Sequence, residues 1–253
     1  MRVDAARVGE IIREAADAEV LPRFRRLAAH QIREKKPGQL VTEADTAAEA
    51  VLARRLTELV PAAVVGEEGV DADPALLKAL EHDGPVWVID PVDGTANFAA
   101  GRARFAVVVA LVVDGTTVAG WILDPVPGRM VVAEVGSGAW LGETRLSVMP
   151  EVGLRDMLGS VKKSGRVAGA VRQVARKGSA AHDYVDLVTG RLHFAHFRRL
   201  MPWDHAAGVL IHAEAGGYAS LLDGRAYSPA RSDGDLLLTP GQASWDALAG
   251  LVE

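Results

Sequence analysis

The chain contains no cysteine, which excludes disulfide bonds and thiolate metal ligands. Lysine and arginine never run beyond a doublet such as Lys35-Lys36, so the sequence offers no obvious patch for nucleic acid or a membrane surface. The N-terminal residues start an amphipathic pattern and contain no apolar signal core. The longest apolar run, from Phe105 to Val113, is far short of the roughly 20 residues that span a bilayer. A cytoplasmic protein is therefore expected.

The sequence is rich in apolar residues and has a small excess of acidic over basic residues. The 253 residues are 49% hydrophobic with a mean hydropathy of +0.12, so the chain can bury a substantial core. This composition excludes a disordered or fibrous protein. The 33 acidic and 28 basic residues give a net charge of −5. An acidic protein can still accept an anionic substrate where bound cations reverse the local field.

The first part of the chain, residues 1–145, has the pattern of an α+β unit. Helical spacing of apolar residues predicts one helix that ends near Pro22 and a second helix between Ala48 and Leu59. The dipeptide Asp114-Gly115 lies between two apolar runs, which predicts a β-hairpin. Strands are expected at 64–65, 86–89, 105–113, 117–123, 131–134, 140–141 and 146–148.

The second part, residues 146–253, alternates shorter elements and is typical of an α/β unit. Strands are expected at 171–175 and 192–197, and helices at 180–188 and 205–215. No Pro- or Ser-rich linker separates the two parts. We therefore expect them to pack tightly, with a cleft between them.

The segment with the most chemical information is Trp87-Val88-Ile89-Asp90-Pro91-Val92-Asp93-Gly94-Thr95. An apolar strand leads directly to two carboxylates, which the following turn can direct to one point. Hard divalent cations such as Mg²⁺ bind oxygen ligands and keep water and substrate phosphate as the remaining ones. Backbone N–H groups of Gly94 and Thr95 could bind a phosphate if a helix begins there. Taken alone, the same residues are equally typical of a polar turn.

Three further segments carry acidic residues, and each has an ordinary structural explanation when taken alone. Glu67 and Glu68 follow a short strand, as in an exposed loop tip. Asp204 is typical of a helix N-cap. Thr42 and Asp45 have the spacing of a capping box at the start of the second helix.

Histidines and loop lysines are likewise assigned structural roles. His193 and His196 are three residues apart on a predicted strand, so they face opposite sides of it. The remaining histidines, such as His205, are isolated and form no metal motif. Lys35 or Lys36 could cover a phosphate, but their sequence context favours solvated lysines on a loop.

Taken together, four motifs in this order resemble the inositol monophosphatase family. They are LVTEAD (40–45), GEEG (66–69), WVIDPVDGTANF (87–98) and WDHAAGVLIHAEAGG (203–217), and the resemblance covers nearly the whole chain. It implies a layered αβαβα sandwich of mixed α+β class, with the site between residues 1–145 and 146–253. It also implies Mg²⁺-dependent hydrolysis of a small phosphorylated metabolite, two to three Mg²⁺ ions, inhibition by Li⁺ and a homodimer.

The resemblance also implies roles for individual residues. Glu67, Asp90 and the carbonyl of Val92 correspond to ligands of the first Mg²⁺, and Asp90, Asp93 and Asp204 to ligands of the second, with a third, weaker ion near Glu67. Gly94 and Thr95 correspond to the phosphate-binding amides, and Thr95 with Asp45 to the pair that activates the attacking water. Two cations about 3.5–4 Å apart would neutralise the phosphate, whose charge of about −2 otherwise repels a nucleophile.

The alcohol end of the substrate site departs from the family. Gly178-Ser179-Ala180 matches the family segment beside the polyol, but Phe197 stands where inositol-hydrolysing members have a glutamate that binds ring hydroxyls. An apolar ring cannot replace a hydrogen-bond acceptor. The alternatives to inositol phosphate are a sugar phosphate, a 3′-phosphoadenosine nucleotide and histidinol phosphate.

Two rival hypotheses remain at this point. The segment DPVDGT also resembles the DxDGT loop of haloacid dehalogenase-like phosphatases, in which the first Asp is a covalent nucleophile. In that loop the two acids are two residues apart, whereas Asp90 and Asp93 are three apart. The second rival is a regulatory, protein-binding member that retains the fold without the reaction, although every expected carboxylate is present.

Overall fold

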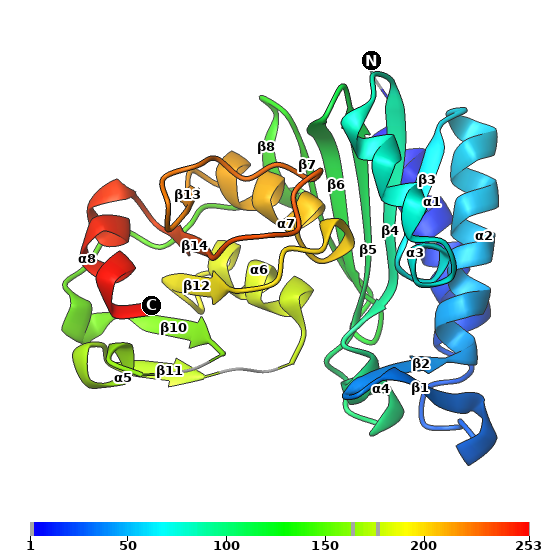
Figure 1. Cartoon of the computed structure of the whole chain (residues 1–253), viewed down its shortest axis with the longest axis horizontal. Helices are drawn as coiled ribbons and strands as arrows, with labels where there is room; N and C mark the ends of the chain where they lie inside the picture. The colour runs from blue at the N-terminus through cyan, green and yellow to red at the C-terminus, as the bar shows by residue number, and fades with distance from the viewer. Residues whose placement is uncertain (1–2, 163–164, 176–177, 253) are drawn as a thin grey trace.

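Five layers of secondary structure, in the order helices, sheet, helices, sheet, helices, make up the protein (Figure 1). The computed structural model describes residues 3–162, 165–175 and 178–252. Its α-helices are α1 (Ala5–Ala15), α2 (Glu43–Leu59), α3 (Glu67–Ala72), α4 (Thr95–Ala99), α5 (Val167–Ala170), α6 (Ala180–Val188), α7 (Pro202–Glu214) and α8 (Gln242–Val252). None of these helices is long and apolar enough to cross a membrane.

The strands form two large sheets and one small hairpin. The hairpin pairs β1 (Ile32–Lys36) with β2 (Gln39–Thr42). The first sheet has the order β3 (Ala63–Gly66), β4 (Pro85–Asp93), β5 (Ala106–Val113), β6 (Thr116–Asp124), β7 (Arg129–Glu134), β8 (Gly138–Leu141), β9 (Thr144–Arg145). The second has the order β11 (Gln173–Ala175), β10 (Leu158–Val161), β12 (Phe194–Phe197), β14 (Leu236–Thr239), β13 (Tyr218–Leu221).

The layering follows from apolar side chains on both faces of each sheet. In β4, Val86 and Val88 pack toward α6 and α7, whereas Trp87 and Ile89 pack toward α1 and α2. The same two-residue alternation in β14 directs Leu237 away from the central helices, toward α8. Because successive strand side chains point to opposite faces, a continuous apolar strand is buried on both sides. This confirms the expected αβαβα sandwich.

Several local predictions are confirmed in detail. The hairpin turn lies at Asp114-Gly115, where φ is 51° and 74°, as a type I′ turn requires. The helix expected at 180–188 has those bounds in α6. The first helix ends at Ala15, but a π-helical turn continues it to Val20, close to the expected end.

Other local predictions differ from the structure. Residues 146–148 are not a strand, because β8 already pairs with the two-residue strand β9 at Thr144–Arg145. Lys35 and Lys36 do not lie in a loop but in β1, and only Pro37 and Gly38 form the turn to β2. Strands β10, β13 and β14 and helix α8 were not predicted from the sequence.

Helix α7 comes from the second part of the chain, yet it packs directly on the first sheet. A Cβ atom added at Gly120 of β6 would lie 2.8 Å from the Cα and 3.1 Å from the carbonyl oxygen of Ala207 in α7. The absence of a side chain at Gly120 therefore sets how closely α7, and the acidic residue in its first turn, approaches the sheet.

We expect Gly120→Ala to lower the free energy of unfolding by roughly 1–3 kcal/mol, because the methyl group meets backbone that cannot move aside independently. Gly250→Ala in α8 is the matched control, since a Cβ there has no neighbour within 4 Å. It should be neutral or stabilise by up to about 1 kcal/mol through helix propensity. Urea unfolding of both variants measures the difference, and equal stabilities would contradict the close approach.

Candidate active site

A β-bulge in β4 brings Asp90 and Asp93 to the same face of the sheet. Asp90 pairs with Val108 and Asp93 with Ala106 of β5, so three steps on one strand oppose two on the other. In a regular strand, residues three apart would face opposite sides, and the extra residue cancels that alternation. Pro91, which has no N–H group to donate to the ladder, lies inside this bulge.

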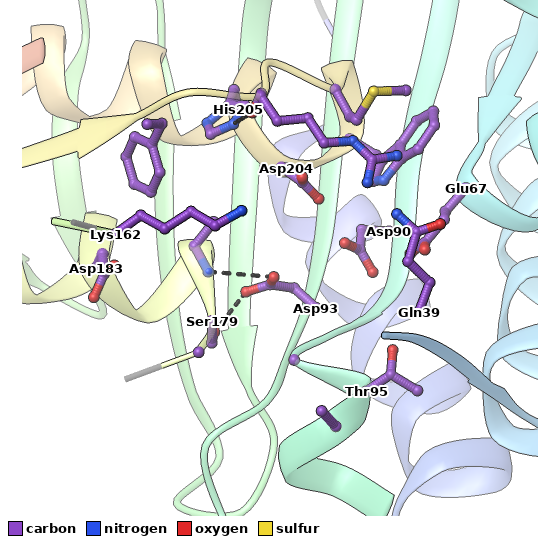
Figure 2. Close-up of a pocket in the computed structure, with 18 of the residues that line it drawn as sticks. Gln39, Glu67, Asp90, Asp93, Thr95, Lys162, Ser179, Asp183, Asp204 and His205 are labelled. Atoms are coloured by element: carbon purple, nitrogen blue, oxygen red, sulfur yellow. Dashed lines mark hydrogen bonds between the residues drawn. The ribbon is translucent and has the colours of Figure 1, made fainter. Parts of the chain in front are cut away.

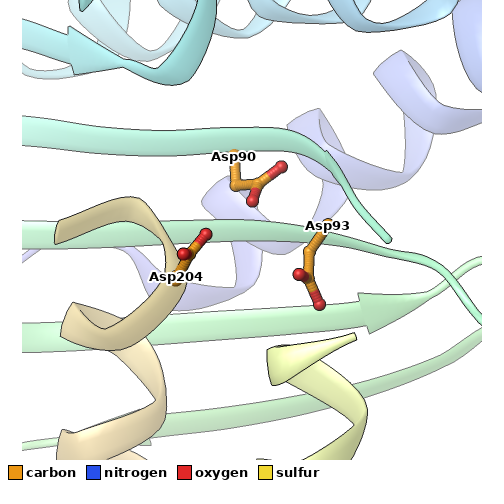
Figure 3. A group of neighbouring side chains, drawn as sticks. All are labelled: Asp90, Asp93 and Asp204. Carbon is orange, nitrogen blue, oxygen red and sulfur yellow. The ribbon is translucent and has the colours of Figure 1, made fainter. Parts of the chain in front are cut away.

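The third carboxylate of the group is Asp204, in the first turn of α7. Its carboxylate and those of Asp90 and Asp93 each offer an oxygen, and these oxygens lie within 4.8 Å of one another (Figure 3). The expectation that Asp204 caps the helix is wrong, because Met201 is the N-cap and Pro202 begins the helix. A first-turn position still places the carboxylate at the positive end of the helix dipole.

The three carboxylates strongly perturb one another. Burial, and then the charges of Glu67, Asp93 and Asp204, raise the pKa of Asp90 well above its ordinary value. Burial and the charge of Asp93 do the same to the pKa of Asp204. Like charges this close are stable together only when protonated or neutralised by a cation. The ligand atoms that these three residues offer are carboxylate oxygens, which suit a hard divalent cation.

Glu67 begins α3 at the end of β3 and lines the same cavity, beside the three-carboxylate group. Burial raises its pKa to about 7, against the opposing effect of the Lys35 ammonium. That ammonium is 8% exposed and lies 3.3 Å from Glu67 and 2.7 Å from Glu68. The expectation of a solvated Lys35 is therefore wrong, since pairing in β1 turns this side chain inward. Lys36 is exposed as expected.

Thr95 and Asp45 are brought together from α4 and α2. The Thr95 hydroxyl lies 3.1 Å from Oδ1 of Asp45 and 3.0 Å from the carbonyl of Val92. Oδ2 of Asp45 accepts from the backbone and hydroxyl of Thr42, which confirms the capping box. Burial raises the pKa of Asp45 to about 6, despite these hydrogen bonds. The Asp45 carboxyl is thus fixed in place, and its pKa lies in the range that suits a general base.

Asp93 is held from the opposite side by the start of α6. Ser179 donates to its Oδ2 at 2.5 Å, and the amides of Ala181 and Ala180 donate at 2.7 and 3.3 Å (Figure 2). Ser179 and Ala180, expected beside the substrate alcohol, thus direct these polar groups to Asp93. Contact with substrate stays a prediction for them and for Gly178, which lines the cavity.

The cavity around these residues has a volume of about 750 Å³. Gly94 and Thr95 lie at its floor, and Gly94 has φ 93° with no room for a side chain, because a Cβ would lie 2.9 Å from the carbonyl of Arg104. Phe197 forms part of the wall and stacks on Tyr184 with ring centroids 5.4 Å apart. Lys162 extends along the wall beside Asp183, across from Glu67 (Figure 2).

Residues that contact the site residues and hold them in place were not predicted from the sequence. Glu49 accepts from the amides of Glu68 and Gly69 at 2.8 and 2.7 Å and so fixes the start of α3. His182 contacts Ser179 at 2.8 Å. The spacing of Ser179 and His182 at the start of a predicted helix could have indicated their contact. No sequence pattern indicated the role of Glu49.

Comparisons with known proteins identify the family of this chain. A family model described as "Inositol monophosphatase family" matches residues 2–252. An inositol-1-monophosphatase of Mycobacterium leprae is 37% identical over 204 residues, which are 73% of this chain and 69% of that protein. A Thermotoga maritima protein named fructose-1,6-bisphosphatase/inositol-1-monophosphatase is 32% identical over 203 residues, 76% of each. A solved Thermotoga maritima IMPase superposes with a TM-score of 0.83 at 26% identity, covering 96% of this chain and 94% of the other.

The raised pKa of Asp45 predicts a pH-dependent effect of Asp45→Asn on the metal-free protein. A folded-state pKa of about 6 against an ordinary 3.8 means that ionised Asp45 costs the folded state about 3 kcal/mol. This cost appears as the pH rises from about 4 to about 6 and then stays constant. The stability of the variant relative to the unaltered protein should therefore increase across that window.

Urea unfolding with EDTA at several pH values measures this difference. Asp223→Asn is the control, because Arg225 lowers the pKa of that exposed carboxyl. Its relative stability should fall as the pH rises toward the ordinary pKa of 3.8 and should then stay constant between about 4 and 6. A flat profile for Asp45→Asn would contradict the buried, perturbed carboxyl.

Proposed function

Because the chain belongs to the inositol monophosphatase family of metal-dependent phosphatases, we propose that it hydrolyses a small phosphate monoester with Mg²⁺ as the metal. The observation that carries this proposal is the group of three carboxylates, Asp90, Asp93 and Asp204, whose oxygens lie within 4.8 Å of one another. Their repulsion in a largely buried position gives the folded protein a strong affinity for a hard cation.

The residues proposed to hold the ions are those implied by the family motifs. One ion would be held by Glu67, Asp90 and the carbonyl of Val92, and a second by Asp90, Asp93 and Asp204, with a weaker third ion near Glu67. When bound, such ions neutralise the phosphate and the leaving alkoxide and lower the pKa of water. The carbonyl of Val92 keeps a lone pair available beside the hydroxyl of Thr95.

Asp45 and Thr95 are proposed to move the proton of the attacking water. The Thr95 hydroxyl has one proton, which it can pass to Oδ1 of Asp45 at 3.1 Å. Its oxygen can then accept a proton from a water in the cavity. A carboxyl with a pKa of about 6 accepts and releases a proton near neutral pH more readily than an ordinary Asp.

The amides of Gly94 and Thr95 are proposed to bind the phosphate oxygens. Both residues line the cavity at the end of β4, where the backbone turns from the strand into α4. Gly94 needs its left-handed backbone conformation to make that turn. This would place the phosphate between the carboxylate-held cations and the backbone N–H groups.

A second candidate substrate class has an additional anionic group on its alcohol. Among the described residues no carboxylate pairs with Lys162, and its side chain lies along the cavity wall (Figure 2). Arg199 also lines this cavity. A neutral polyol would use neither charge, whereas a sugar bisphosphate or a nucleotide would. The bisphosphatase name of the Thermotoga relative supports the inclusion of such compounds.

The covalent-nucleophile hypothesis finds little support at Asp90. Its Oδ1 accepts from the amide of Val92 at 3.0 Å, and the residue is 1% exposed. Asp90 is therefore better placed to bind cations than to attack phosphorus.

The first test is phosphate release from inositol 1-phosphate, fructose 1,6-bisphosphate, 3′-phosphoadenosine 5′-phosphate and histidinol phosphate, with Mg²⁺ and with EDTA. We expect release to require Mg²⁺ and Asp90→Asn to reduce kcat/KM roughly 10³-fold, because Asp90 would contribute a ligand to both proposed cation sites. Asp114→Asn, in the distant hairpin turn, is the control. Release that persists in EDTA, or with Asp90→Asn, would refute the proposal, and inactivity on the whole panel would favour the regulatory hypothesis.

Phe197→Glu should shift the ranking within that panel toward inositol 1-phosphate. A carboxylate at this wall can accept hydrogen bonds from ring hydroxyls, which the phenyl ring cannot do. We expect kcat/KM for inositol 1-phosphate to rise relative to that for the bisphosphate by about tenfold or more. Phe197→Leu is the matched control for the loss of stacking on Tyr184. If both variants rank the substrates alike, Phe197 does not select the alcohol.

A further inference from the structure

We propose that Asp124, His182 and Ser179 form a relay of buried polar contacts that positions Asp93 for cation binding, with His182 as the positioning residue. The three residues come from different elements, namely the end of β6 and the first turn and N-cap of α6. The role of the relay rests on the proposed function of Asp93 as a metal ligand. The direction of its hydrogen bonds can be tested separately.

The relay is continuous and buried. Ser179 Oγ lies 2.5 Å from Oδ2 of Asp93 and 2.8 Å from Nδ1 of His182. On the other side of the imidazole, Nε2 lies 3.5 Å from Oδ2 of Asp124. Ser179, His182 and Asp124 are 5%, 7% and 7% exposed, so water does not substitute freely for these contacts. Arg129 also approaches Asp124, at 3.4 Å from its half-exposed guanidinium.

Counting the protons fixes the direction of each hydrogen bond. Oδ2 of Asp93 accepts from the amide of Ala181 and from Ser179, which uses its single hydroxyl proton in that bond. The bond at 2.8 Å then requires Nδ1 of His182 to donate to Ser179 Oγ. The remaining lone pair of Oγ accepts from the backbone amide of His182 at 3.3 Å, which fills the valence of the hydroxyl.

Asp124 lies on the far side of the imidazole, with its Oδ2 3.5 Å from Nε2. His182 is thus packed between Asp124 and Ser179, with Nδ1 directed at the Ser179 hydroxyl. Without this imidazole, the Ser179 hydroxyl would be free to rotate away from Asp93.

The consequence for Asp93 is a fixed carboxylate with one oxygen directed to the cavity. Oδ2 accepts from Ser179 and from the amide of Ala181, whereas Oδ1 accepts from the amide of Ala180 at the longer distance of 3.3 Å. Residues that orient a ligand in this way typically change metal affinity 10–100-fold when they are removed. The relay therefore prepares Oδ1 for the cation.

The protonation of His182 can be read directly by ¹⁵N NMR of the imidazole in the full-length, metal-free protein at neutral pH. We expect Nδ1 of His182 to carry a proton. A neutral ring with an unprotonated Nδ1 would mean that Ser179 donates to His182 instead of Asp93, and would overturn the relay. His182→Leu assigns the signals.

A double-mutant cycle tests whether His182 acts through Ser179. Mn²⁺ affinity, followed by electron paramagnetic resonance, should weaken about tenfold or more in His182→Leu and in Ser179→Ala. The double variant should bind Mn²⁺ no more weakly than Ser179→Ala, because the histidine has no target without the hydroxyl. Independent, additive losses would overturn the proposal.

Two controls separate the relay from general destabilisation and from the proposed function. Ser220→Ala removes another buried hydroxyl, which donates to the backbone carbonyls of Leu221 and Arg225, and should leave Mn²⁺ affinity unchanged. Thermal unfolding shows which variants are folded. Failure of the unaltered protein to bind Mn²⁺ would refute the metal site itself, whereas the NMR measurement would still decide how His182 and Ser179 are bonded.

Discussion

Mutual repulsion of buried carboxylates is the constraint on which the rest of this structure depends. Asp90, Asp93 and Asp204 present oxygens within 4.8 Å of one another, and burial raises the pKa of each. No fold would gather these groups for stability alone, because ionised carboxylates at this distance oppose folding. The surrounding structure therefore supplies rigid supports that hold the carboxylates in place, and the proposed divalent cation would supply the missing charge.

The supports come from several layers of the sandwich. The bulge of β4 directs Asp90 and Asp93 to one face, and α7 crosses the first sheet closely enough at Gly120 to bring in Asp204. The start of α6 holds Asp93 through backbone amides. Because the carboxylates belong to different elements, a cation bound among them would also link the two parts of the chain. On the proposed function, metal affinity and folding stability would therefore be coupled.

The sequence predicts most of what is local and little of what depends on distant contacts. The carboxylates around Asp90, the capping box at Thr42 and the bounds of α6 follow from short patterns. The role of Lys35 did not follow, because only the pairing of β1 with β2 turns it toward Glu67. The N-cap of α7 was predicted at Asp204, but Pro202, a residue type favoured at the first helical position, begins the helix. The second sheet was harder still, since its strands are four residues or fewer.

The difference between local patterns and distant contacts also explains why the sequence predicts the type of reaction better than it predicts the substrate. At the phosphate end, each carboxylate must be placed and neutralised, which restricts residue type and leaves motifs in the sequence. At the alcohol end, the hydroxyl of Ser179 is already engaged by Asp93, so the proposed determinants of selectivity are wall side chains such as Phe197 and Lys162. Phe197 packs against the rings of Tyr184 and His205, so a change there would alter the wall first. Substrate range can therefore vary while the chemistry at the phosphate is preserved.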